Sequence, residues 1–255
     1  MAKQSGLGDN LYVAGYDLSG DISSIGNVGG GPAALDVTGI DKSAMERIGG
    51  IKDGRLQFAS FFNKGTDRAH PRLSALPIGD VVASYFRGIT LGGPSANIVA
   101  KQLNYDGTRG DSGEFTFSID AQANGYGVEW GRSLTAGKRT DTTGTNGLSV
   151  DFGAGSPPLF DGNALFGLQA YLHVFAFTGT SLTVKLQQSS DNGGTDAWAD
   201  VTGGTFTAAT GVTSERIATS GSQTVKRYLR VVTTGTFTSA TFAVSVVRND
   251  TAVVF

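Results

Sequence analysis

Apolar and polar residues alternate with a period of two along much of this chain. Phe115, Phe117 and Ile119 fall on one side of their segment, and the Thr, Ser and Asp residues beside them fall on the other. The same alternation occurs in residues 182–187 and 225–231. A period of two predicts strands with one buried face and one face in water, as in antiparallel sheets.

Turn residues rich in Gly, Asn and Asp divide these alternating segments into a series of strands. We expect strands at 10–18, 33–38, 55–63, 80–87, 96–105, 114–123, 126–131, 147–152, 167–178, 181–189, 197–201, 205–209, 214–219, 225–233 and 237–248. Tight turns are expected at 106–107, 178–179, 191–194 and 234–235. Short helices are plausible only at 41–48, where Asp41 could act as the N-cap, and at 69–76.

The segment GAGSPPLFDGN at 153–163 is the best candidate for a domain boundary. Two consecutive prolines cannot continue a strand ladder, and the composition changes there. We therefore expect a first domain at 1–155, a Gly/Pro linker at 156–163 and a second domain at 164–255. The predicted fold class is mainly β: an antiparallel β-sandwich or barrel with one short helix, followed by a second, smaller β-sandwich.

Composition supports this fold class and narrows the function. Glycine makes up 38 of 255 residues, and charged residues make up only 16%. The absence of cysteine excludes disulfide scaffolds, thiolate catalysis and cysteine-ligated zinc. The net charge of −2, with neither half basic, argues against a protein that wraps DNA. The N-terminus does not read as a signal peptide, and no run of eighteen apolar residues predicts membrane insertion.

Candidate catalytic and metal-binding residues are few. His70 and His173 lie far apart in sequence and without metal-ligand spacing, so packing or capping roles are favoured. Asp191 and Asp196 bracket a loop that could hold calcium, although a plain turn is the better interpretation. The glycines at 29–31 precede Pro32 and a strand, which is the wrong context for a phosphate loop. We expect no catalytic residues, no metal and no cofactor.

Four aromatic residues could form a sugar-binding platform. They are Trp130, Trp198, Tyr126 and Tyr171. The favoured alternative is that Trp130 and Trp198 each pack at the edge of a core.

Several long segments, taken in order, resemble one family. They are 35–63 (LDVTGIDKSAMERIGGIKDGRLQFASFFN), 97–131, 134–142, 168–191 and 225–249. Together these segments resemble the major tail protein, or tail tube protein, of long-tailed, non-contractile (siphovirus-like) bacteriophages, in particular the actinobacteriophage type.

This resemblance implies a non-enzymatic structural protein of the virion. Six copies would form a ring, and stacked rings would form the tail tube through which the genome is ejected. It also implies a loop that contacts the next ring, whose expected residues are Asp41, Lys42, Glu46, Arg47, Lys52 and Asp53. The implied partners are further copies of the chain, the tape measure protein, the tail terminator and the distal tail protein, with DNA passing through without specific binding. The implied location is the virion tail, after assembly in the host cytoplasm.

Two questions stay open at this level. The second domain could decorate the outside of a tube wall made by the first, or it could complete the tube fold itself. The main functional alternative is a glycan-binding β-sandwich, such as an adhesin or receptor-binding part of the tail. A secreted β-hydrolase is disfavoured because no acid–base constellation is evident.

Overall fold

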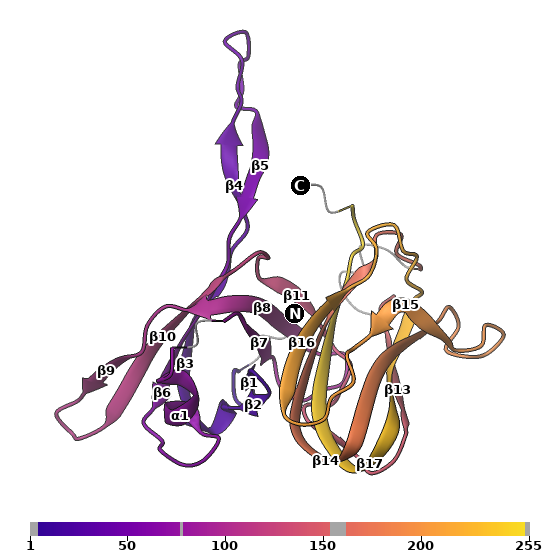
Figure 1. The fold of residues 1–255 in the computed structure, drawn as a ribbon. Coiled ribbons are helices and arrows are strands. Elements are labelled where there is room, and N and C mark those ends of the chain that lie inside the picture. The colour runs from indigo at the N-terminus through magenta and orange to yellow at the C-terminus, as the bar shows by residue number, and fades with distance from the viewer. Residues whose placement is uncertain (1–4, 77–78, 154–161, 253–255) are drawn as a thin grey trace. The chain divides into compact units, whose positions relative to one another are not determined.

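The computed structural model describes residues 5–76, 79–153 and 162–252, and its regular structure is almost entirely antiparallel β-strand (Figure 1). This confirms the predicted fold class. One short α-helix occurs in the described ranges, α1 (Ala69–Leu73), together with the 3-10 turn η1 (Ser19–Asp21). Neither is long and apolar enough to cross a membrane.

The described residues divide into two compact units. Unit 1 contains those within 5–20, 82–97 and 130–252, and unit 2 contains those within 21–81 and 98–129. The units are thus interleaved along the chain, whereas the expected domains 1–155 and 164–255 follow one another. Residues 156–161 of the expected linker lie outside the described residues, and the linear division stays a prediction.

Unit 1 is built on two unusually long strands that pair with each other over almost their whole length, β14 (Leu168–Ser189) and β17 (Tyr228–Arg248). Each of them changes partners along its length. β14 pairs first with β16 (Thr213–Ala218) and later with β15 (Ala199–Thr205). β17 pairs in turn with β13 (Asn146–Asp151), β12 (Arg139–Asp141) and β11 (Glu129–Ser133). The same unit contains β1 (Asn10–Val13), β2 (Tyr16–Asp17) and most of β7 (Val81–Phe86).

Two predicted turns are wrong, because the long strands continue through them. The Thr-Gly pairs at 178–179 and 234–235 lie inside β14 and β17, where the register shifts at Gly179. A Cβ atom on Gly235, whose φ is +124°, would lie 2.3 Å from the carbonyl oxygen of Ser181. These glycines therefore permit bulges and close backbone approach, not chain reversal. The turn expected at 106–107 is also displaced, since these residues begin strand β9 (Asp106–Arg109).

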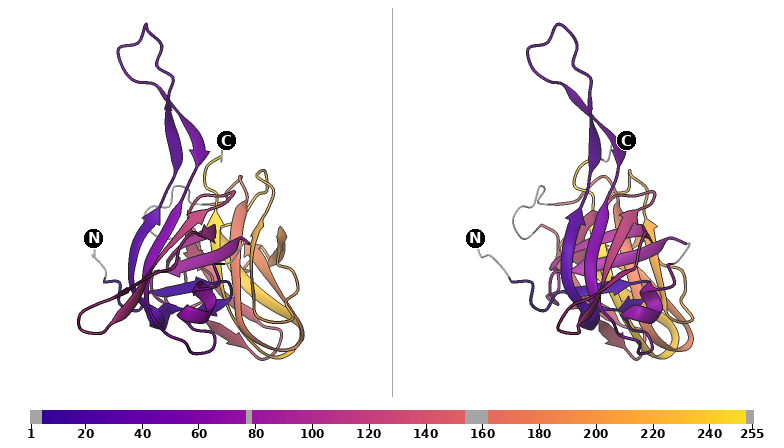
Figure 2. Two further views of the ribbon diagram at one scale, coloured as in Figure 1. Left: turned by 60° about the vertical axis from the view of Figure 1, so that its left-hand side comes forward. Right: turned by 90° about the vertical axis from the view of Figure 1, so that its left-hand side faces the viewer.

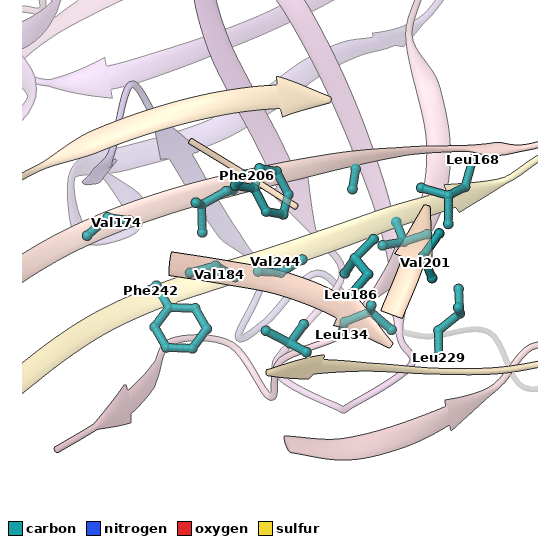
Figure 3. Packing of buried hydrophobic residues seen from close by; sticks show 14 of the residues in the cluster. Leu134, Leu168, Val174, Val184, Leu186, Val201, Phe206, Leu229, Phe242 and Val244 are labelled. Atoms are coloured by element: carbon teal, nitrogen blue, oxygen red, sulfur yellow. The ribbon is translucent and has the colours of Figure 1, made fainter. Parts of the chain in front are cut away.

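The core of unit 1 lies between these ladders. Aliphatic and aromatic side chains from β14, β15 and β17 converge in it (Figure 3). Val174, Val184 and Phe242 are fully buried there. This packing explains why apolar residues occupy every second position of the alternating segments, on the side of each strand that faces the core.

Unit 2 is the smaller unit, and its main ladder is centred on β10 (Phe115–Ala123). One edge of β10 pairs with β6 (Arg55–Phe61), which pairs in turn with β3 (Ile22–Gly29). The other edge pairs with β9 and with the end of β8 (Pro94–Gln102). Its core side chains include Leu56, Phe58, Phe117 and Ile119.

Helix α1 is shorter than the expected helix at 69–76 but occurs at the expected place. The carboxylate of Asp21 accepts hydrogen bonds from the backbone N–H of Ala69 (3.0 Å) and from the side chain of Asn63 (2.8 Å). A residue far away in sequence thus satisfies a free N–H group at the start of the helix.

Candidate functional site: a projecting hairpin

The most distinctive surface of unit 2 is a long hairpin, residues 32–52, that we call the arm. It consists of β4 (Pro32–Asp36), an apical loop at 37–46 and β5 (Arg47–Lys52). These two strands form a sheet of their own and pair only with each other. Figures 1 and 2 show the arm rising from one end of β3 and β6, away from the other strands of unit 2.

Local contacts order the arm without a core. Leu35 lies opposite Ile48 in the ladder, and its side chain packs over Gly50. At the start of the loop, Thr38 donates its backbone N–H and its hydroxyl to the carboxylate of Asp36 (2.9 and 2.6 Å). The Thr38 hydroxyl in turn accepts the backbone N–H of Glu46 (2.8 Å), which joins the two ends of the loop.

The expected helix at 41–48 is therefore wrong. Its first part belongs to the apical loop, and its last two residues belong to β5. Pairing of β5 with β4 outweighs the weak helical preference of an eight-residue segment, since isolated helices of that length are not stable in water.

The root of the arm depends on a close backbone approach. Gly30 has φ +147°, and a Cβ atom there would lie 2.3 Å from the carbonyl oxygen of Asp53. Asp53 also donates its backbone N–H to the carbonyl of Gly31 (3.2 Å). Gly54, the next residue, has no space for a Cβ because Val128 N would lie 2.6 Å away. Glycines thus fix the point at which the arm leaves the sheet.

The arm exposes an unusual amount of apolar surface. Ile40 in the apical loop is fully exposed, and Ile51 on β5 is 88% exposed. Four more large apolar side chains on the arm are exposed: Leu35, Val37, Met45 and Ile48. Because a two-stranded hairpin in water is marginally stable, such a surface is a candidate for contact with a partner.

The charged residues expected to contact a neighbouring ring are distributed along the arm. Asp41, Lys42 and Glu46 lie in the apical loop, Arg47 and Lys52 lie on β5, and Asp53 lies at the root; all six are exposed. Lys42 and Glu46 form an ion pair at 3.4 Å. The role of these residues in a contact remains an expectation.

Sequence reasoning overlooked the apolar members of the same stretch. The signal was present, because isoleucines at positions 40, 48 and 51 interrupt a polar, glycine-rich segment. The exposed aliphatic side chains thus lie on the same hairpin as the predicted charged residues.

The two histidines have packing roles in the described structure. His173 is buried in unit 1, where its Nδ1 accepts the backbone N–H of Gly15 (3.3 Å) and its Nε2 lies 3.0 Å from the Ser84 hydroxyl. Burial lowers the pKa of His173 to about 3, so the ring stays neutral. His70 lies in α1 of unit 2, with its Nδ1 3.2 Å from the hydroxyl of Tyr105.

The loop with Asp191 and Asp196 is held together by its own hydrogen bonds. Asp191 accepts backbone N–H groups from residues 194–196, and Asp196 pairs with the Lys226 ammonium at 2.7 Å. Lys226, with the N–H and hydroxyl of Ser190, lowers the pKa of the Asp196 carboxyl to about 2. The carboxylates thus stabilise the turn by accepting hydrogen bonds and pairing with Lys226. Within 5–76, 79–153 and 162–252, no three His, Cys, Asp or Glu side chains are grouped as a metal site.

Two of the four aromatic residues considered for a sugar platform are not available for stacking in unit 1. Tyr171 is fully buried. Trp198 has the Arg230 guanidinium 4.4 Å from its ring centre, and a Cβ on Gly193 would lie 2.4 Å from its indole nitrogen. Trp130 and Tyr126 are exposed.

Comparison with known proteins gives only distant similarities. No known protein family matches the chain, and no curated protein is similar to it in sequence. Among solved structures, a protein of the virion of a native gene transfer agent particle is 13% identical with a TM-score of 0.38, over 49% of this chain and 98% of that one.

Two phage proteins are similar over most of both chains. The Dit protein of phage SPP1, from the hub of an adsorption apparatus, is 11% identical with a TM-score of 0.33, over 93% of this chain and 98% of that one. A protein of the phage p2 baseplate is 10% identical with a TM-score of 0.35, over 95% of this chain and 99% of that one. Because all three TM-scores lie below 0.5, the functional conclusion depends on the residues of this chain.

Proposed function

We propose that this chain is a non-enzymatic structural protein of a phage tail, and that its copies assemble as stacked hexameric rings into a tail tube. The arm is the observation that carries this proposal. It is a surface of six exposed apolar side chains on an extension that has no core of its own. An apolar extension of this kind is stabilised when another copy covers it.

The type of assembly follows from the asymmetry of the arm. A surface that projects from one end of unit 2 cannot meet itself without a two-fold axis, but it can meet a different surface of the next copy. Such heterologous contacts generate rings where the rotation closes and filaments where it does not. A stack of rings uses both kinds of contact, and the sequence resemblance to tail tube proteins points to the same architecture.

A tube that conducts DNA should not bind phosphate strongly. The small net charge of −2 suits this role, because a strongly basic channel would retain the DNA. In this proposal residues 1–155 form the wall and 164–255 lie outside it. A reconstruction with residues after 160 lining the channel would contradict that arrangement.

Electron microscopy of the purified protein tests the proposal. We expect tubes or six-fold rings from the unmodified chain, and we expect Ile40→Asp to abolish them, because a charge at the tip cannot be buried in a contact. The matched control is Leu165→Asp, which changes a 58% exposed apolar residue in 164–255, outside the proposed wall, and should leave assembly intact. Dispersed particles whose tryptophan fluorescence falls on addition of sugars would instead support a glycan-binding protein.

A further inference from the structure

The main ladder of unit 2 has one face turned to its core and one face turned to water. On β10, the side chains that alternate with Phe117 and Ile119 point away from the core and are half-buried or exposed. Their cross-strand neighbours on β3, β6, β9 and the end of β8 share this direction. We call this surface the polar face, and its central row on β10 is Thr116, Ser118, Asp120 and Gln122.

Most side chains of the polar face are short and uncharged. Ala59 of β6 lies between Ser118 of β10 and Ser24 of β3. Thr116 lies opposite Thr108 of β9. Hydroxyl groups of this kind bind water and reach only a short distance from the backbone. The polar face is therefore a hydrated surface with few long side chains.

The composition of the polar face differs from that of a contact between proteins. The centres of such contacts are rich in aromatic residues, Met and Arg, and depleted in Ser and Ala. Among the side chains that the described ladders place on this face, Phe61 at the end of β6 is the one large apolar residue. The arm, with six exposed apolar side chains, has the opposite composition. The arm thus suits a contact between copies, and the polar face does not.

The cations of the polar face are paired with carboxylates. Arg55 Nε lies 3.8 Å from the carboxylate of Asp120, and Lys101 Nζ lies 2.9 Å from that of Asp80. Asp106, opposite Ser118, adds a third carboxylate to these two cations. DNA binding depends on Lys and Arg groups that neutralise phosphates and release their counterions. With its cations already neutralised, the polar face offers phosphate no net attraction.

We infer that the polar face lines the channel of the proposed tube, where DNA passes over it with water between them and is not held. This inference rests on the proposed function and names the surface of the wall that faces the genome. A surface without an apolar patch does not bind a second copy, and a surface without net positive charge does not retain DNA. The polar face combines both properties.

Cysteine labelling of assembled tubes tests this placement, because the native sequence has no cysteine. Tubes of Ser118→Cys, an exposed position, are treated with a biotin maleimide, which is small enough to enter a channel that passes DNA. Streptavidin on gold particles wider than the tube is then added. We expect biotin on most chains but bare tube sides, and at least about ten times more gold per chain after the tubes are dissociated. Tubes of Leu165→Cys, whose residue is 58% exposed in 164–255, should carry gold along their sides.

Ser24→Cys on β3 repeats the measurement at a second exposed position of the polar face. Gold along the sides of the Ser118→Cys and Ser24→Cys tubes would place the polar face on the outside and overturn the inference, while the tube proposal would stand. Biotin uptake only after dissociation, or loss of tubes in both variants, would place the face in a contact between copies and overturn the inference as well. If the unmodified chain forms no tubes, the proposed function and this inference both fail.

Discussion

Two antiparallel ladders of this protein differ in how far their side chains are exposed to solvent. In unit 1, β14 and β17 pair over about twenty residues, and their inward side chains are buried. In unit 2, β4 and β5 form a shorter ladder in which every described side chain with a Cβ is exposed. The backbone hydrogen bonding is of the same kind in both.

The difference shows that strand pairing alone does not decide what a segment does. Backbone hydrogen bonds add little net stability, because the unfolded chain makes equivalent bonds with water. Burial of the apolar face stabilises the β14–β17 ladder within its own unit. The arm has apolar side chains but no face of its own unit to pack on, so burial could stabilise it only through a partner, as in the proposed assembly.

The largest effect on stability is expected from the truncation of a buried aromatic ring in unit 1. Phe242→Ala should lower the free energy of unfolding by about 3–5 kcal/mol, because Phe242 is fully buried and leaves a cavity. Ile51→Ala on the arm should change it by no more than about 0.5 kcal/mol, because Ile51 is already in water. Urea denaturation of the unassembled chain measures both. Similar losses for the two variants would show that the arm has an intramolecular partner.

Acid should weaken unit 1 through His173. The pKa of His173 is lowered to about 3 in the folded chain by burial, whereas an unfolded histidine titrates near 6.5. Between these values only the unfolded state gains the proton, so the free energy of unfolding falls as pH falls. The slope is at most about 1.4 kcal/mol per pH unit.

Denaturation of the wild type and of His173→Gln at several values between pH 7 and pH 4 measures this effect. The glutamine variant should lose the part of the slope that belongs to one proton, and the slope due to carboxylates should remain. Parallel curves for the two proteins would mean that His173 has the same pKa in the folded and unfolded states.

Two glycines allow the same substitution to be compared in the two ladders. Gly235→Ala places a Cβ 2.3 Å from the Ser181 carbonyl inside unit 1 and should destabilise the fold by about 1–3 kcal/mol. Gly30→Ala produces the same clash at the root of the arm, which pairs with no strand outside itself. For Gly30→Ala we expect faster amide exchange in residues 32–52 and a smaller loss in the free energy of global unfolding than for Gly235→Ala. Hydrogen exchange with mass spectrometry measures both quantities. Equal global losses would show that the arm is part of the cooperative fold.

The smallest effect is expected at the ion pair of the apical loop. Lys42 and Glu46 are both exposed, so Lys42→Ala should change the stability of the single chain by less than about 0.5 kcal/mol. Denaturation at low and high salt measures it. A larger and salt-dependent loss would mean that the ion pair orders the arm before assembly.

Some elements could be read directly from the sequence. Alternation in residues 114–123 gave β10 almost residue for residue, and the loop at 191–194 was also correctly placed. These features depend on local chemistry: a period of two for a half-buried strand, and Asn and Gly residues that accept positive φ angles.

Other elements could not be predicted without knowing which segments pair with them. The Thr-Gly pairs at 178–179 and 234–235 have the composition of turns, yet each faces the other long strand and becomes part of a bulged ladder. The segment 41–48 has weak helical character, yet it forms a loop and the start of β5 because β4 pairs with that strand. In both cases a long-range contact outweighed a local preference.

The sequence by itself determined a glycine-rich, mainly β protein, free of cysteine, with an exposed and charged stretch before β6. Only the tertiary structure decided that this stretch is a projecting hairpin whose apolar side chains are exposed. The reason is that exposure is a property of what surrounds a residue. The sequence does not distinguish an isoleucine in a core from one at the tip of an arm. Only the packing around the residue shows whether it is buried or exposed.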